Sequence, residues 1–65
     1  MKTLKGVFKT VNKFECNDEI LTVIPIELII NKIELERECF VNVRVNSSNS
    51  LVITSICYLS DLNFQ

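Results

Sequence analysis

The stretch Ile33–Val45 reads IELERECFVNVRV, and its alternation decides the fold class. Odd positions are apolar apart from Arg37, and even positions are polar or charged apart from Phe40. Because successive side chains of a strand point to opposite faces of a sheet, this pattern predicts a strand with one buried and one solvated face. The run of 13 residues is long for a strand, so we expect a bulge or bend between Arg37 and Cys39.

The segment before this run, 25–37, fits either a helix or one arm of a β-hairpin. A helix places four isoleucines on one stripe, and Pro25 suits a first helical position. Four β-branched residues lower the helix propensity, however, and two leucines fall on the opposite side. A hairpin that turns at 31–32 instead brings Leu28 opposite Leu35. We favour the hairpin and keep the helix as the alternative.

Three other segments carry strand patterns. Leu4–Phe14 alternates, Ile20–Ile24 is a short apolar run, and Leu51–Leu59 is apolar on both phases, with polar turns at 17–19 and 46–50 between them. With the two hairpin strands, five strands in 65 residues predict an all-β fold, either a small five-stranded barrel or a twisted antiparallel sheet. The alternative is an α+β fold with one helix at about 25–37. Residues 1–65 form a single small domain in both cases.

The cysteine pattern indicates free thiols. The three cysteines, Cys16, Cys39 and Cys57, are odd in number and widely spaced, and all fall on the inward phase of their predicted strands. Residues 1–6 contain no apolar leader, so nothing suggests secretion. We therefore expect a cytoplasmic protein whose cysteines behave as small buried hydrophobes. Because histidine is absent and the thiols are not clustered, we expect no metal site and no cofactor.

The apolar content exceeds what a small core needs. Hydrophobic residues make up 48% of the chain and the mean hydropathy is +0.28. The longest apolar stretch, Ile20–Ile30, is too short to span a bilayer, so we expect no membrane partner. Surplus apolar surface usually becomes an interface, which favours a homo-oligomer or another protein as partner. The predicted interface residues are Phe40, Tyr58, Leu62 and Phe64.

The sequence contains few of the residues that catalysis usually requires. A serine or cysteine nucleophile normally needs an adjacent base, and the chain has no histidine. Gly6 is the only glycine, so a glycine-rich phosphate loop is excluded. The carboxylates Glu34, Glu36 and Glu38 share the predicted wet face of their strand and are interpreted as a solvated acidic row. We therefore expect no enzyme activity.

Charge is distributed unevenly along the chain. Residues 1–14 sum to +4, residues 15–38 to −5, and residues 39–65 to zero. The basic strip consists of Lys5, Lys9 and Lys13 on one predicted face, with Arg44 as a further cation. It fits protection of a sheet edge, pairing with the acidic row within one subunit or across a dimer, or contact with nucleic acid. A pI near 5.2 and few stacking aromatics count against nucleic acid.

Three functions follow as hypotheses. The first is a non-catalytic interaction module that associates with itself through its apolar patch. The second is a small barrel that binds single-stranded nucleic acid through the basic strip. The third is an inhibitor or regulator that docks on a larger enzyme through the acidic row. The asparagine-, isoleucine- and lysine-rich composition is typical of an AT-rich bacterial or phage genome.

Overall fold

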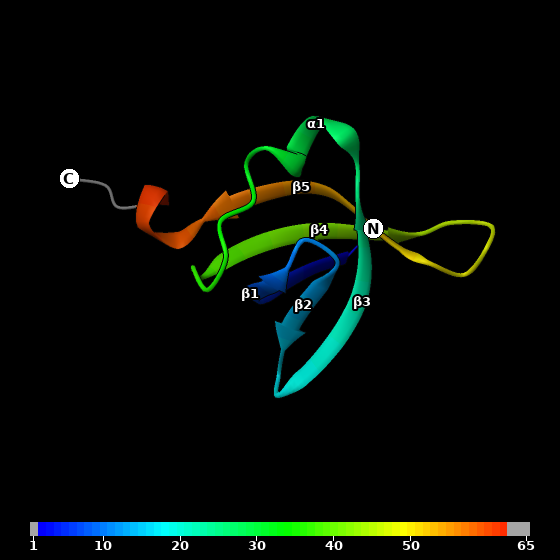
Figure 1. The fold of residues 1–65 in the computed structure, drawn as a ribbon, viewed down its shortest axis with the longest axis horizontal. Helices are drawn as coiled ribbons and strands as arrows, with labels where there is room; N and C mark the ends of the chain where they lie inside the picture. The colour runs from blue at the N-terminus through cyan, green and yellow to red at the C-terminus, as the bar shows by residue number, and fades with distance from the viewer. Residues whose placement is uncertain (1, 63–65) are drawn as a thin grey trace.

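A computed structural model describes residues 2–62, which form five strands and two helical turns (Figure 1). The strands are β1 (Lys2–Thr10), β2 (Lys13–Cys16), β3 (Glu19–Pro25), β4 (Cys39–Val45) and β5 (Leu51–Tyr58). The helix α1 (Glu27–Ile30) lies between β3 and β4, and the 3-10 helix η1 (Leu59–Leu62) follows β5. The all-β prediction is confirmed.

The strands close into a barrel in the order β1-β2-β3-β5-β4. Neighbouring strands are antiparallel except β3 and β5, which run parallel. The ring closes at this parallel pair, where only Val23–Pro25 of β3 meet Leu51–Ile53 of β5. A five-stranded barrel with this order, and with a helix between β3 and β4, has the connectivity of the OB-fold.

The hairpin predicted at 31–32 is wrong, and so is the first part of the long strand. α1 occupies a single turn directly after β3, and β4 begins only at Cys39. Between them the chain crosses beside β1, where Leu35 bridges to Phe8 and the Glu36 N–H donates to the Phe8 carbonyl at 3.0 Å. Glu36 has a left-handed backbone (φ 63°), which no strand residue adopts. The alternation of 33–38 therefore does not mark a strand: Ile33 and Arg37 are half-buried, but Leu35 between them is exposed.

The segment predicted as one strand over Leu4–Phe14 is a hairpin. The chain turns at 11–12, and β1 and β2 pair with Phe8 opposite Phe14. Both phenylalanines keep the inward phase that the alternation predicts, because Phe14 resumes it after the turn. The structure has five strands, as predicted, but not the same five. The predicted strand Leu4–Phe14 is two strands, β1 and β2, and the strand predicted between Pro25 and residue 31 does not form.

A bulge in β5 changes which side chains point inward. Asn42 pairs with Ser55 but Val43 pairs with Ile53, so Thr54 is an extra residue. Side chains after the bulge switch face, which buries Tyr58 and exposes Cys57. The predicted inward position of Cys57 is therefore wrong, while the other two cysteines are buried.

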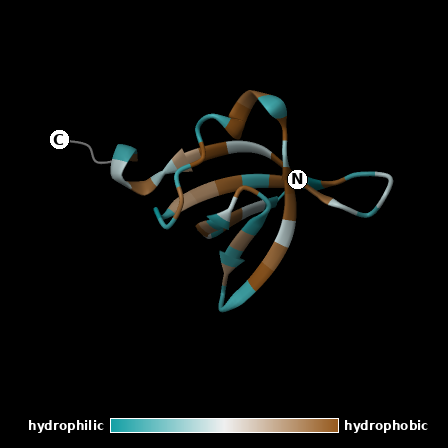
Figure 2. Cartoon of the chain, viewed as in Figure 1, coloured by the Kyte–Doolittle hydropathy of each residue, from teal (hydrophilic) through white to brown (hydrophobic). Residues whose placement is uncertain are grey.

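The core is built around two aromatic rings. Phe8 and Phe14 are fully buried, and their ring centroids lie 5.0 Å apart in an edge-to-face arrangement. Side chains from the remaining strands and from α1 surround them: Cys16, Val23, Ile29, Cys39, Val41, Val43, Ile53 and Tyr58. The hydrophobic bands of these strands are visible in Figure 2. Burial of each large apolar side chain contributes roughly 1.5–3 kcal/mol.

Gly6 allows β1 to approach β2 closely. A Cβ atom at position 6 would lie 1.9 Å from the Glu15 carbonyl oxygen and 3.1 Å from the Phe14 ring. The first of these neighbours is backbone, so it cannot move aside without displacing β2 from the barrel. The single glycine of the chain therefore stands where two strands and a core ring meet.

We expect Gly6→Ala to lower the free energy of unfolding by about 2 kcal/mol or more, because an added methyl overpacks this contact. Urea denaturation measured by circular dichroism checks the value. Lys5→Ala is the matched control, since Lys5 is the exposed neighbour, and its effect should stay within about 0.5 kcal/mol. Equal stabilities of the two variants would contradict the steric explanation.

Candidate interaction surface

The residues predicted to form an apolar interface do not lie on one surface. Phe40 is half-buried on the outside of β4, and Leu62 is exposed at the end of η1. Tyr58 belongs to the core with 6% of its surface exposed, so its ring is not offered to a partner. Phe64 lies outside the described residues. Most of the exposed apolar surface therefore lies outside this predicted set.

Tyr58 instead anchors the crossing segment 31–38. Its hydroxyl donates to the Lys32 carbonyl at 2.5 Å and accepts from the Glu34 N–H at 2.6 Å. Burial raises the pKa of this hydroxyl, which keeps it protonated and able to donate. One side chain thus satisfies two backbone groups of a segment that has no regular structure of its own.

Arg37 completes this anchor from the solvent side. Its guanidinium lies 4.3 Å from the centre of the Tyr58 ring, a cation–π contact. It forms ion pairs with Glu34 at 2.9 Å and with Asp61 of η1 at 3.4 Å, and it donates to the Ser60 hydroxyl. The hydrogen bond that Arg37 donates to the Glu34 carboxylate is the main cause that raises the pKa of Arg37. Arg37 therefore links the crossing segment to the end of the barrel wall.

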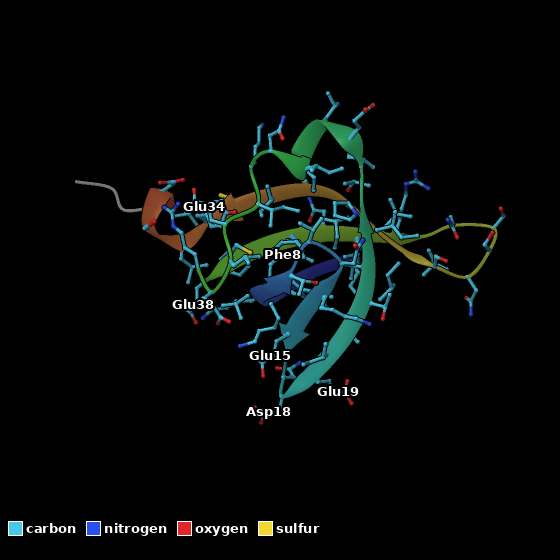
Figure 3. All side chains as sticks on the ribbon, in the orientation of Figure 1. Phe8, Glu15, Asp18, Glu19, Glu34 and Glu38 are labelled. Carbon is cyan, nitrogen blue, oxygen red and sulfur yellow. The ribbon has the colours of Figure 1, made fainter. Side chains whose placement is uncertain are left out.

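The acidic row does not form. Glu34, Glu36 and Glu38 precede β4, and the backbone turn at Glu36 breaks any common strand face. Glu34 is paired with Arg37 as described, while Glu36 pairs with Lys9 at 2.9 Å. In Figure 3 the labelled acidic residues fall into two groups: Glu34 and Glu38 beside the crossing segment, and Glu15, Asp18 and Glu19 at the β2–β3 hairpin.

The basic strip is divided between two strands. Lys5 and Lys9 lie on β1, whereas Lys13 lies on β2 and donates to the Thr22 hydroxyl at 2.8 Å. Lys9 is partly neutralised by Glu36 and by Glu15 at 3.8 Å, and the hydrogen bond that it donates to Glu36 is the main cause that raises its pKa. The ion pair between Lys9 of the basic strip and Glu36 of the predicted acidic row thus forms within one subunit.

We call the outer face of β1, β4 and β5 the β1–β4 face. It combines a row of hydrogen-bonded polar side chains with one aromatic ring. The Thr3 hydroxyl donates to the Asn42 amide oxygen at 2.7 Å, and the Asn42 amide nitrogen donates to the Ser55 hydroxyl at 2.8 Å. One row along, Lys5 pairs with Phe40 and Phe40 with Cys57. The remaining predicted cation, Arg44, is exposed further along β4. This face holds its polar groups in fixed positions around one accessible phenyl ring.

The outer row of β3 exposes aliphatic side chains that the sequence did not single out. This row, the β3 row, consists of Ile20, Thr22 and Ile24, and its isoleucines are 58% and 47% exposed. The opposite phase of β3 faces the core, where Val23 is fully buried. An available signal was that both phases of 20–24 are apolar apart from Thr22, as in a strand with two apolar faces. Much of β3 is coloured as hydrophobic in Figure 2.

Two leucines outside the strands are also strongly exposed. Leu28 on α1 is 82% exposed, and Leu35 in the crossing segment is 53% exposed. They lie on a one-turn helix and on irregular chain, so they do not form a row on a regular strand as Ile20 and Ile24 do. Single exposed apolar side chains of this kind are common on protein surfaces.

No protein family, curated protein or solved structure matches this chain. Residues 2–62 enclose no pocket. Over the same residues, no group of three or more acidic or cysteine side chains is placed to hold a metal ion. Neither α1 nor any other helix in the described part of the chain is long and apolar enough to cross a membrane.

We expect Tyr58→Phe to lower the free energy of unfolding by about 1–3 kcal/mol, because it leaves two backbone groups of the crossing segment without a partner. Amide hydrogen exchange provides the local measurement: the Glu34 amide should exchange faster in the variant. The Glu36 amide, which donates to Phe8, is the internal control and should keep its protection relative to global stability. Unchanged exchange at Glu34 would contradict the anchoring role.

Proposed function

We propose that this protein is a non-catalytic interaction module that associates with itself through the β3 row. The observation that carries this proposal is the exposure of Ile20 and Ile24 on the same face of one strand, on either side of Thr22. β-Branched side chains on a regular strand are held in nearly fixed rotamers, so ordering them at an interface costs little entropy. Their contact with a second apolar surface would remove them from water.

Cysteine chemistry supports a cytoplasmic location for this module. All three cysteines are free thiols, as in proteins of reducing compartments. Burial raises the pKa of Cys39 to about 11, so this thiol stays protonated and unreactive at neutral pH. Cys57 is exposed, and a reducing environment would keep it from forming disulfides between molecules.

Self-association is tested by light scattering behind size exclusion over a wide range of protein concentrations. The mass should rise from the 7.5 kDa of one chain toward twice that value, and high salt should not dissociate the dimer because the contact is apolar. The double variant Ile20→Ser/Ile24→Ser should remain monomeric at concentrations where the natural chain is dimeric.

The matched control is Leu28→Ser/Leu35→Ser, which removes an equal number of exposed aliphatic side chains away from β3. This variant should dimerise like the natural chain. A natural chain that stays monomeric at every concentration would overturn the proposed self-association. Equal loss of dimer in both double variants would show that general hydrophobicity, rather than the β3 row, drives association.

Binding of single-stranded nucleic acid is the second candidate, and the β1–β4 face favours it. On this face Lys5 lies opposite Phe40, Arg44 is exposed four residues further along β4, and the outward side chains of β1 and β4 include no carboxylate, although Lys9 of β1 is paired with Glu36 and Glu15. A phenyl ring flanked by cations is the local chemistry of stacking sites for single strands. Barrels with OB connectivity often bind oligonucleotides, although a fold alone does not define a function.

Fluorescence anisotropy with short DNA and RNA oligomers at low salt tests this second candidate. If it holds, affinity should fall steeply with salt, and Lys5→Gln/Arg44→Gln should reduce the salt slope by roughly 0.7 for each lost phosphate contact. Lys32→Gln removes a cation from the crossing segment and should leave the slope unchanged. Flat titrations with both oligomers would exclude this candidate.

We do not propose an inhibitor that docks through an acidic strand, because the acidic strand does not form. It requires Glu34, Glu36 and Glu38 on one strand face, and these residues lie outside the strands. Two of the three carboxylates are already paired with cations of the same chain.

A further inference from the structure

Half of β3 has a free edge. β2 pairs with Glu19–Thr22 on one side of β3. On the other side, the pairing with β5 begins only at Val23 and covers Val23–Pro25. Within residues 2–62, no strand lies along that second side of Glu19–Thr22. Figure 1 shows this part of β3 extending with β2 away from the rest of the barrel, down to the turn at 17–18. We call the unpaired side of Glu19–Thr22 the β3 edge.

The backbone groups of two residues point out from the β3 edge. The Val23 N–H donates to the Asn12 carbonyl at 2.9 Å, so the odd-numbered residues of β3 direct their N–H and C=O toward the side of β2. Strand amides alternate in direction, so the N–H and C=O of Ile20 and the N–H of Thr22 point to the unpaired side, whereas the parallel pairing of Val23 with Leu51 uses the Thr22 carbonyl. These groups form a template onto which another strand can add.

The β3 edge lacks the features that usually prevent strands from pairing between molecules. Lysines, prolines and bulges are the common protections of an edge. A comparison is provided by β1, whose Lys2–Lys5 segment pairs with β4 but not with β2 and carries two lysines. Glu19–Thr22 carries no lysine or proline, and its pairing with β2 is regular. One free edge thus carries two lysines, and the other carries a single charge, Glu19, next to Ile20.

We propose that two copies of this chain associate by antiparallel pairing of their β3 edges about a two-fold axis at Ile20. This arrangement rests on the self-association proposed above and confines its contact to the first half of β3, which leaves Ile24 outside it. The Ile20 N–H and C=O of each copy bond to those of the other, and the two Ile20 side chains meet across the axis. An interface of this length belongs to the small, transient class rather than to obligate dimers.

The register follows from two constraints. Residues opposite each other in an antiparallel pair share a face, so the axis must pass through a residue and not between two residues. An axis at Leu21 would place Glu19 of the second copy opposite Val23, a position that Leu51 of β5 already occupies. An axis at Ile20 places Asp18 of the second copy opposite Thr22, so the paired strand begins at its turn just where the free edge ends.

Charges complement one another in this register. Thr22 is the cross-strand partner of Lys13, whose ammonium group already reaches its hydroxyl. In this register the turn of the second copy, which holds Asp18, lies next to Thr22 and Lys13, and the two-fold axis repeats this approach. The symmetry thus brings the cation of β2 to the acidic hairpin tip of the other copy, which favours a second copy as the occupant of the edge.

The decisive comparison is between Ile20→Lys and Ile24→Lys. Both replace an exposed isoleucine of the β3 row by lysine, but Ile24 lies where β3 is paired with β5 and outside the proposed contact. We expect Ile20→Lys to raise the dimer dissociation constant at least about tenfold, because like charges then face each other on the axis. Ile24→Lys should change it less than about threefold. Sedimentation equilibrium measures both constants, and chemical denaturation verifies that both variants fold.

A cross-link tests the register directly in a Cys57→Ser background. Opposite residues in a hydrogen-bonded antiparallel pair have Cα atoms about 5.5 Å apart, within the range of a disulfide. Ile20→Cys should therefore form a disulfide-linked dimer under mild oxidation, and Ile24→Cys should not.

The outcomes separate the two proposals. If the natural chain is dimeric but both lysine variants lose the dimer equally, the β3 row associates face to face and the edge pairing is overturned. If the dimer survives in both variants, the contact lies elsewhere and both the edge pairing and the β3 row fail. A natural chain that is monomeric throughout overturns self-association itself, and with it the edge pairing.

Discussion

The short parallel contact between β3 and β5 is the constraint on which the rest of the structure depends. Pairing of Val23–Pro25 with Leu51–Ile53 closes the ring, and without it the barrel would be an open sheet. Because this contact spans only three residues on each strand, it leaves the first half of β3 without a neighbour on that side. Closure of the core and exposure of a pairing edge are thus two consequences of the same register.

The end of the barrel depends on side chains rather than on strand pairing. The crossing segment 31–38 has no ladder of its own and is held mainly by Tyr58, Arg37 and the contact of Leu35 and Glu36 with Phe8. Buried hydrogen bonds to backbone groups are costly to lose, whereas exposed ion pairs contribute little by themselves. Tyr58 is therefore the main anchor, and the charges around Arg37 fix the orientation of the segment.

Some elements of the site follow from local sequence. The outward phase of Lys5 and Lys9 and the inward phase of Phe8 and Phe14 are readable because β1 keeps one phase from Leu4 to Lys9, with Val7 as the only apolar residue on the outward side. Phe40 stands out as an apolar residue on a polar phase, and it does lie on the outer face of β4. The β3 edge had no such signal, because a free edge is defined by the absence of a neighbour that lies elsewhere in the chain.

By itself, the sequence determined the β class, the phases of β1 and β4, and the scarcity of catalytic groups, because these depend on residue types and on a period of two. Only the tertiary structure decided the course of 31–38, the exposure of Cys57 and the burial of Tyr58. The first depends on contacts with β1 and β5, and the other two on one extra residue opposite β4. Such features arise between segments far apart in the chain, where local alternation carries no information.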